Sequence, residues 1–358
     1  MLTRGYERPI LWGYNPWLVG AYAGVPAIAR VYHATENYFD FDAVDEFFLD
    51  AKSIALASSD LVVAVSDGVA ASVALHAAPD RIAVITNGCD LEDYSADGPT
   101  DAELEATSAP FNRTAIYAGN VNGRLDFRLV ERLADEHPRT LFAIFGPVAE
   151  LNADDGSCWR QLIARSNLKY FGAVPPDRLA ALYRTADVGI IPYKRTPWLI
   201  RNGFPLKALE MGATGLPAVA SRMEPLRGVA DALVVTEDDD AFASAFLAIE
   251  RGTLNAAQRT NLATVCAAND YDRKFEEVLR LVGTLEVGGP ATRVDPLISH
   301  LEPAEWMDLC SGYARSFASM RAAAYGAAYR AVGQLLPGPV RRAIPKALRD
   351  RARRRLAH

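Results

Sequence analysis

The chain has 358 residues, of which 50% are hydrophobic and 23% are charged, and its formal net charge at pH 7 is −6. This length accommodates two α/β domains with an appendage, and the acidic balance argues against a protein that binds nucleic acid over its whole surface. The four cysteines lie far apart without a Cys-x-x-Cys spacing, which gives no metal signature and favours a reducing, cytoplasmic location. No apolar run reaches the length of a membrane span.

In the first part of the chain, short apolar runs alternate with segments of helical periodicity. Strands are predicted at residues 9–14, 27–33, 61–66 and 82–85, and helices at 17–24, 41–56 and 66–76. This alternation is typical of a parallel sheet whose strands are joined by helices. Residues 91–112 come next and are polar, acidic and rich in small side chains, so we expect a linker there.

The same alternation resumes after this linker. Strands are predicted at residues 114–117, 141–145, 168–171, 188–192 and 216–221, and helices at 127–136, 159–165, 176–184, 205–215, 242–251 and 271–285. A second linker is predicted at 286–300 and a long helical segment at 303–335. The arginine-rich tail at 340–356 has the pattern of a cationic amphipathic helix, which favours contact with an anionic membrane surface; a solvated terminus is the alternative.

The helix expected from Pro205 carries the first candidate binding residues. Proline suits the first position of a helix, because its missing N–H has no partner there. Lys207 and Glu210 follow one turn apart, so a cation and a carboxylate share one face near the positive end of the helix dipole. This arrangement suits a nucleotide; the alternative is a solvated helix face with a weak ion pair.

The run PLKALEMGATGLPAVAS, residues 205–221, resembles the nucleotide-sugar signature of GT-B glycosyltransferases, Pro-x-Lys-x-x-Glu-x-x-Ala-x-Gly-x-Pro-Val-Val. Residues 59–66 (SDLVVAVS) and 86–90 (TNGCD) resemble the end of the first domain in that family. The resemblance implies an α/β fold with two Rossmann-like domains that face a cleft. Compared with the family, roughly half of the first domain is absent by domain-size expectation, so we expect a shortened first domain.

These observations give a domain organisation. We expect a shortened Rossmann-like domain on the acceptor side at 1–108 and a nucleotide-sugar-binding domain at 109–268. A helix that crosses back to the first domain is expected at 269–285, and a helical extension with the basic tail at 286–358.

The resemblance also implies roles for residues of the second domain. Glu210 is expected to accept hydrogen bonds from the ribose hydroxyls, and Lys207 to neutralise the donor diphosphate. The loop that contains Gly119, Asn120 and Arg124 lies between a strand and a helix, where glycine lets the backbone approach phosphate. Gly146, directly after the next strand, is assigned to the same donor group. A plain strand-to-helix turn has the same composition.

Two residues near the end of a first-domain strand are candidates for catalysis. His33 occupies the place where many GT-B enzymes have a histidine that touches the donor sugar, and Glu36 is the nearest carboxylate before Asp40. Either residue is a candidate base for deprotonation of an acceptor hydroxyl. A histidine at a strand end is also often structural. Asn202 stands where many retaining members have a glutamate, and an amide carries no charge, so retention or inversion stays open.

The sequence therefore predicts a glycosyltransferase. The expected donor is a nucleotide-diphosphate sugar, and the expected acceptor is a glycan or a lipid-linked glycan of cell-surface polysaccharide synthesis. No metal or other cofactor is implied. Two alternatives remain: a donor-binding pseudoenzyme or partner subunit, which Asn202 and the shortened domain favour, and a nucleotide-sugar epimerase of the same fold.

Overall fold

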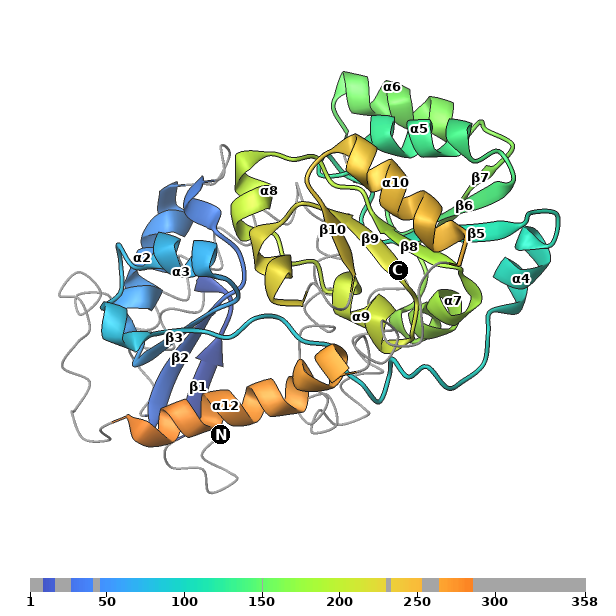
Figure 1. The fold of residues 1–358 in the computed structure, drawn as a ribbon. Coiled ribbons are helices and arrows are strands. Elements are labelled where there is room, and N and C mark those ends of the chain that lie inside the picture. The colour runs from blue at the N-terminus through green and yellow to red at the C-terminus, as the bar shows by residue number, and fades with distance from the viewer. Residues whose placement is uncertain are drawn as a thin grey trace, which may run out of the picture. The chain divides into compact units, whose positions relative to one another are not determined.

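The computed structural model describes residues 9–16, 27–40, 46–149, 151–229, 233–252 and 264–285. The chain divides into two compact units (Figure 1): unit 1 runs to Thr86 and resumes at Lys274, and unit 2 is Asn87–Arg273. The helices predicted at 17–24 and 303–335, the linker at 286–300 and the tail at 340–356 lie outside the described residues. No helix in the described ranges is both long and apolar enough to cross a membrane.

Unit 1 is built on a parallel sheet with the strand order β1-β2-β3-β4. The strands are β1 (Ile10–Gly13), β2 (Ala29–Ala34), β3 (Leu61–Ala64) and β4 (Ile82–Val84). The helices are α2 (Glu46–Ser58), α3 (Asp67–Val73) and α12 (Tyr271–Thr284), and single 3-10 turns lie at η3 (Tyr38–Asp40) and η4 (Pro79–Arg81). The helix predicted at 271–285 is thereby confirmed.

Helices cover both faces of the unit 1 sheet. Successive residues of a strand point to opposite faces, so alternate side chains pack against different helices. Val62 and Ala64 pack into the cluster that contains residues of α2 and α3. Leu61 and Val63 pack on the other side, together with Val278 of α12. β3 and β4 are accordingly apolar at every position, as expected for a buried parallel sheet, whereas β2 also contains Arg30 and His33.

Unit 2 has a six-stranded parallel sheet with the order β10-β9-β8-β5-β6-β7. The strands are β5 (Arg113–Ala118), β6 (Thr140–Phe145), β7 (Leu168–Gly172), β8 (Val188–Ile191), β9 (Ala218–Ser221) and β10 (Val234–Thr236). The helices are α4 (Ala102–Ser108), α5 (Phe127–Glu136), α6 (Ala153–Leu162), α7 (Leu179–Thr185), α8 (Pro197–Asn202), α9 (Lys207–Ala213) and α10 (Asp239–Glu250), with 3-10 segments η5 (Pro176–Arg178) and η6 (Glu224–Val229).

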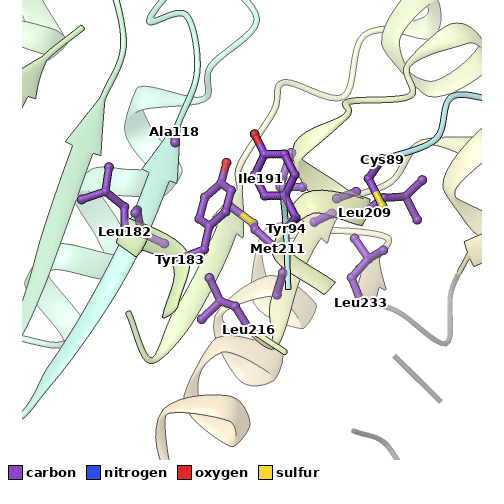
Figure 2. Close-up of a cluster of buried hydrophobic side chains, with 14 of the residues drawn as sticks. Cys89, Tyr94, Ala118, Leu182, Tyr183, Ile191, Leu209, Met211, Leu216 and Leu233 are labelled. Atoms are coloured by element: carbon purple, nitrogen blue, oxygen red, sulfur yellow. The ribbon is translucent and has the colours of Figure 1, made fainter. Parts of the chain in front are cut away.

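The helices of unit 2 also lie on both faces of their sheet. One buried cluster joins the strands to α5, α6 and α10, and the other joins them to α4, α7 and α9 (Figure 2). From β5 the chain proceeds outward through β6 to β7 and then returns to place β8 on the other side of β5. At such a reversal the two connections leave in opposite directions, and ligands of open α/β sheets bind beyond the carboxyl ends of the strands at this point.

Three local predictions need correction. The linker expected at 91–112 is wrong, because Leu104 is fully buried and Tyr94 lies in the cluster of Figure 2. The helix expected at 159–165 begins earlier, since Asn152 caps it by accepting the Asp155 N–H at 2.8 Å. Between the strand predicted at 188–192 and the helix predicted at 205–215, where no element is predicted, the structure has α8.

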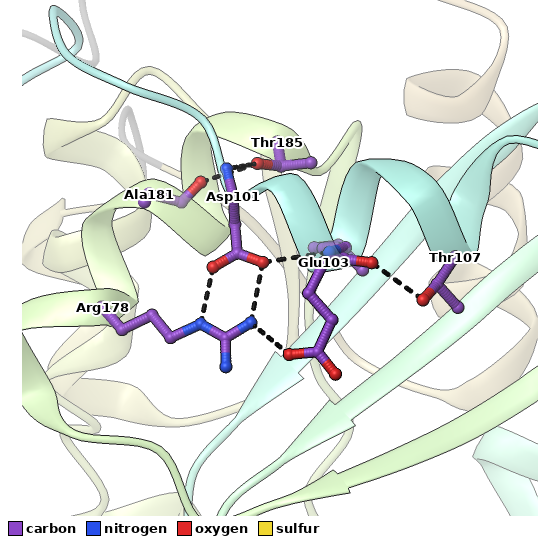
Figure 3. A network of polar contacts seen from close by, with 7 residues as sticks. Asp101, Glu103, Thr107, Arg178, Ala181 and Thr185 are labelled. Carbon is purple, nitrogen blue, oxygen red and sulfur yellow. Dashed lines mark hydrogen bonds and ion pairs between the residues drawn. The ribbon is translucent and has the colours of Figure 1, made fainter.

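A salt-bridge network joins the beginning of α4 to Arg178, at the end of η5, within unit 2 (Figure 3). Asp101 caps α4 by accepting the Leu104 N–H at 2.9 Å, and it receives two hydrogen bonds from Arg178, at 2.6 and 2.8 Å. Arg178 also donates to Glu103 at 2.7 Å. The Arg178 guanidinium holds the pKa of the Asp101 carboxyl below its usual range. Paired charges and a cap therefore fix a segment whose composition resembles a linker.

We predict that Arg178→Met lowers the free energy of unfolding of unit 2 by about 2 kcal/mol, because it leaves the buried Asp101 carboxylate without its cation. Arg132→Met is the matched control, since Arg132 pairs with Glu136 and Asp240 at the surface, where solvent screens the charges, and its loss should have a much smaller effect. The measurement is hydrogen exchange of α4 and β6 peptides over a urea series. Because the Asp101 pKa is depressed, the Arg178 effect should fade as the pH falls below about 4. Equal losses in the two variants would contradict the prediction.

Candidate functional site

The candidate site of unit 2 is formed where the loops after β5, β6 and β8 meet the first turn of α9. The Gly119 N–H donates to the Phe145 carbonyl at 2.8 Å, which joins the first two loops. The Lys194 N–H donates to the Arg124 carbonyl at 2.8 Å, which joins the first loop to the third. Backbone bonds thus hold these connections together at the strand-order reversal.

Two glycines are required by the close packing of these loops. Gly119 has φ +155°, and a Cβ added there would lie 2.2 Å from the Lys207 Nζ. Gly146 has φ +129°, and its Cβ would lie 2.0 Å from the Gly119 carbonyl oxygen. Neither position accepts a side chain. These two candidate residues therefore allow the Lys207 ammonium to lie directly against the backbone of the β5 loop.

Lys207 is the most unusual charge of the site. The residue is only 8% exposed. Its Nζ lies 3.2 Å from the Tyr193 hydroxyl, 4.0 Å from the centre of the Tyr117 ring and 5.3 Å from that of Tyr193. Within the described part of the chain, no carboxylate forms an ion pair with it. A buried ammonium that only aromatic rings and a hydroxyl compensate has a strong attraction for an anion.

The two tyrosines that surround Lys207 also contact the β5 loop. The Tyr117 hydroxyl donates to the Asn120 carbonyl at 2.8 Å, and the two rings meet edge to face with their centres 6.4 Å apart. Burial raises the pKa of Tyr117 well above its usual value. Burial alone would also raise the pKa of Tyr193, but the charge of Lys207 and its hydrogen bond outweigh this effect and lower that pKa.

Arg124 brings a second cation to the same group of loops. Its guanidinium lies over the ring of Trp198 at 5.0 Å, in the first turn of α8. The backbone N–H of Arg124 donates to the Asn122 side chain at 3.0 Å. Lys194, one residue beyond Tyr193, is instead neutralised by the buried Asp155 at 2.8 Å. The cations of this edge thus differ: Lys194 has a carboxylate partner, whereas Lys207 has none among the described residues.

Glu210 and Asn202, the other two candidates, lie on α9 and α8. Glu210 is half-buried, and its charge contributes, after burial, to a raised pKa at Tyr183. Asn202 is 5% exposed, and its Nδ2 donates to the Trp198 carbonyl at 3.0 Å. The Asn202 Oδ1 is buried without a hydrogen-bond partner in the described ranges. One N–H of this amide is therefore used by the helix, and its oxygen has no partner among the described residues.

His33 and Glu36 belong to unit 1, at and beyond the end of β2. The His33 ring lies 5.0 Å from the Tyr14 ring and 5.9 Å from the Trp12 ring, and both its nitrogens are buried without a hydrogen-bond partner in the described chain. Burial lowers the pKa of His33 to about 4, so the ring is neutral at pH 7. The Glu36 carbonyl accepts from Lys52 Nζ at 3.2 Å.

The structure thus brings Gly119, Asn120, Arg124, Gly146 and Lys207 together around one group of loops and places Asn202 on the adjacent α8. Sequence reasoning did not identify Tyr117 or Tyr193. Tyr193 lies two residues after the end of β8, and a polar group near the carboxyl end of a parallel strand is a signal that sequence alone provides. Among the described residues, no three His, Cys, Asp or Glu side chains gather as a metal site.

Comparison with known proteins agrees with this geometry. Residues 112–251 match the family model described as "Glycosyl transferases group 1". This segment is similar to the group 1 glycosyltransferases. The resemblance inferred from residues 205–221 is therefore confirmed.

Curated relatives of the chain carry glycosyltransferase names. The "Putative teichuronic acid biosynthesis glycosyltransferase TuaH" of Bacillus subtilis is 28% identical over 152 residues, which cover 42% of this chain and 36% of that protein. The "D-inositol 3-phosphate glycosyltransferase" of Corynebacterium urealyticum is 26% identical over 243 residues, or 60% of this chain and 54% of that protein. The chain thus spans between about a third and a half of the length of these relatives.

Solved structures share the fold of the chain. HepE of Anabaena in complex with UDP superposes with a TM-score of 0.60 at 18% identity and covers 79% of this chain and 81% of its own. The sucrose-phosphate synthase of Thermosynechococcus elongatus gives a TM-score of 0.59 at 17% identity, with 79% and 75% covered. Both neighbours are GT-B proteins, and the predicted fold class, with two Rossmann-like units, is confirmed.

We predict that Lys207→Met raises the free energy of unfolding of unit 2 by about 1 kcal/mol, because removal of an ammonium without a carboxylate partner relieves its desolvation more than it loses in ring contacts. Lys169→Met, at an exposed position of β7, should change it by less than about 0.5 kcal/mol. The free energy of unfolding of each variant is measured by urea unfolding, followed by hydrogen exchange of β5 and β8 peptides. A clear loss of stability in Lys207→Met would show that the ammonium has a structural role.

We also predict that the His33 imidazole titrates near pH 4 in an NMR titration, with the signal assigned through its absence in His33→Gln. The unfolded chain binds this proton below about pH 6.5 and folded unit 1 does not, so the stability of unit 1 should decrease from that pH down to about 4, by at most about 3 kcal/mol. In His33→Gln this part of the pH dependence should disappear. An apparent pKa near the usual value would mean that the ring is solvated.

Proposed function

We propose that the protein transfers a sugar from a nucleoside-diphosphate sugar to a glycan or lipid-linked acceptor in the synthesis of a cell-surface polysaccharide. The observation that carries this proposal is the Lys207 ammonium, buried without a carboxylate partner in the described chain and packed beneath Gly119 at the strand-order reversal. A buried cation beside a backbone without side chains suits a dense anion such as a diphosphate.

In such a transfer, the bond between the anomeric carbon and the diphosphate oxygen breaks while the acceptor oxygen bonds to that carbon and loses its proton. Negative charge therefore grows on the departing diphosphate. Lys207 and Arg124 supply positive charge at this group of loops, and their packing against aromatic rings fixes them before the donor arrives. Preorganised charge of this kind stabilises the leaving group with little rearrangement. Glu210 is proposed to bind the ribose hydroxyls.

The names of the similar proteins support the choice of substrates. The Bacillus subtilis relative is named for teichuronic acid biosynthesis, and HepE of Anabaena has been solved with UDP and with UDP-glucose. A uridine diphosphate sugar is therefore the first donor to test. A cytoplasmic location, with contact to the inner face of the membrane through residues 340–356, remains part of the proposal.

A second candidate function is a donor-binding partner subunit that does not itself catalyse. Asn202 favours it, because its amide carries no charge and donates to the helix that contains it. A buried His33 with a pKa of about 4 is also a weak proton acceptor near neutral pH. Both observations concern catalysis, and neither affects the anion site at Lys207.

The experiment incubates the full chain with UDP-glucose and a panel of other nucleotide sugars, with and without an extract of lipid-linked acceptors, and follows both free nucleoside diphosphate and transferred sugar. We expect acceptor-dependent release by the wild type and by Lys169→Met, and at least about a tenfold decrease in Lys207→Met. Donor binding without turnover with any acceptor would favour the partner subunit. Absence of binding to every nucleoside diphosphate would overturn both functions, and release of an epimerised sugar without transfer would indicate an epimerase.

A further inference from the structure

The Lys207 ammonium has one partner that the donor-binding function does not account for. Tyr193 lies two residues after the end of β8, and its hydroxyl is 3.2 Å from Lys207 Nζ. An ammonium has three N–H donors. Within the described residues, the Tyr193 oxygen is the one hydrogen-bond acceptor recorded for this nitrogen, and the face of Tyr117 lies 4.0 Å away. The remaining donor capacity is available for a ligand.

Tyr193 itself is held in place by the backbone around it. Its N–H donates to the Ile191 carbonyl at 3.0 Å, and it pairs with Leu125 of the β5 loop in an antiparallel bridge. Its ring meets Tyr117, whose hydroxyl is bonded to the Asn120 carbonyl. The tyrosine that contacts Lys207 is therefore fixed to the loop that would approach the diphosphate.

From this geometry, and on the basis of the proposed function, we propose that Tyr193 is a positioning residue that controls the affinity of the site for the donor diphosphate by setting the place and the effective charge of Lys207. A protonated Tyr193 accepts from Lys207 and leaves the full positive charge available to the diphosphate. A deprotonated Tyr193 forms an ion pair with Lys207, and the net charge offered to the anion disappears.

The surroundings of Tyr193 favour its deprotonation at a lower pH than that of an ordinary tyrosine. The charged and titratable groups that face it are Lys207 from α9, Arg124 from the β5 loop, Tyr117 from β5 and Tyr183 from α7. Burial raises the pKa of Tyr193, but Lys207, with smaller contributions from Tyr117 and Arg124, lowers it below that of an ordinary tyrosine. Tyr117 and Tyr183, in contrast, are kept protonated by burial.

The test measures UDP affinity by calorimetry from neutral pH to about pH 10 for the wild type, Tyr193→Phe, Lys207→Met and the double variant. Tyr94→Phe is the control, because it removes a hydroxyl from another largely buried ring of unit 2. We expect Tyr193→Phe to bind UDP about tenfold more weakly at neutral pH, as for loss of one charge-assisted hydrogen bond. It should also lose much less affinity than the wild type as the pH rises.

The double variant separates positioning from a general effect on the fold. If Tyr193 acts through Lys207, Tyr193→Phe should have no further effect on UDP affinity in the Lys207→Met background. An undiminished effect there, or a wild-type pH profile in Tyr193→Phe, would overturn the proposal.

A second measurement needs no nucleotide and keeps this proposal distinct from the proposed function. Ultraviolet absorbance of the phenolate should show an early tyrosine ionisation in the wild type that is absent from Tyr193→Phe and moves to higher pH in Lys207→Met. If the wild type binds no nucleoside diphosphate, the proposed function fails. If this early ionisation is absent from the wild type or is unchanged in Lys207→Met, the proposal that Tyr193 acts through Lys207 is overturned, whether or not a nucleotide binds.

Discussion

The reversal of strand order between β5 and β8 is the constraint on which the rest of unit 2 depends. It places the carboxyl ends of two strands side by side, with backbone loops leaving in opposite directions. The space beneath those loops is filled by Lys207 from α9, and only glycine at position 119 leaves room for its ammonium. Fold topology, a glycine and one buried charge are thus parts of a single arrangement, and its charge suits an anion.

Much of this fold is predictable from the sequence. The alternation of apolar runs and helical periodicity gives nearly all the strands and most helices of both units, because parallel strands buried on both faces are continuous apolar runs. The errors have local physical reasons. Residues 91–112 have the composition of a linker, yet Asp101 and Arg178 are far apart in sequence, and their pairing fixes α4 on the unit. α6 begins at Asn152, whose side chain satisfies a free N–H that hydrophobic periodicity does not reveal.

Some residues of the candidate site are also predictable from the sequence, and others are not. Lys207, Glu210, Gly119 and Arg124 follow from motif spacing and from their positions after strands. Tyr117 and Tyr193 do not, since an aromatic residue in or beside an apolar strand is most simply interpreted as core. Their importance arises because β8 and α9 bring a hydroxyl to an ammonium 14 residues away in the chain. A pairwise contact of this kind has no signature in periodicity.

The two units differ in how well their candidate residues suit their predicted roles. In unit 2, burial concentrates positive charge where a diphosphate is expected, so desolvation strengthens the predicted binding. In unit 1, burial among the rings of Trp12 and Tyr14 keeps His33 neutral and lowers its pKa to about 4. A base is most effective when its pKa is near the working pH. Both ring nitrogens are buried without a hydrogen-bond partner in the described chain, so the ring is enclosed rather than open to solvent. By the pKa criterion His33 is a weak base near neutral pH, and the catalytic roles of His33 and Glu36 stay predictions.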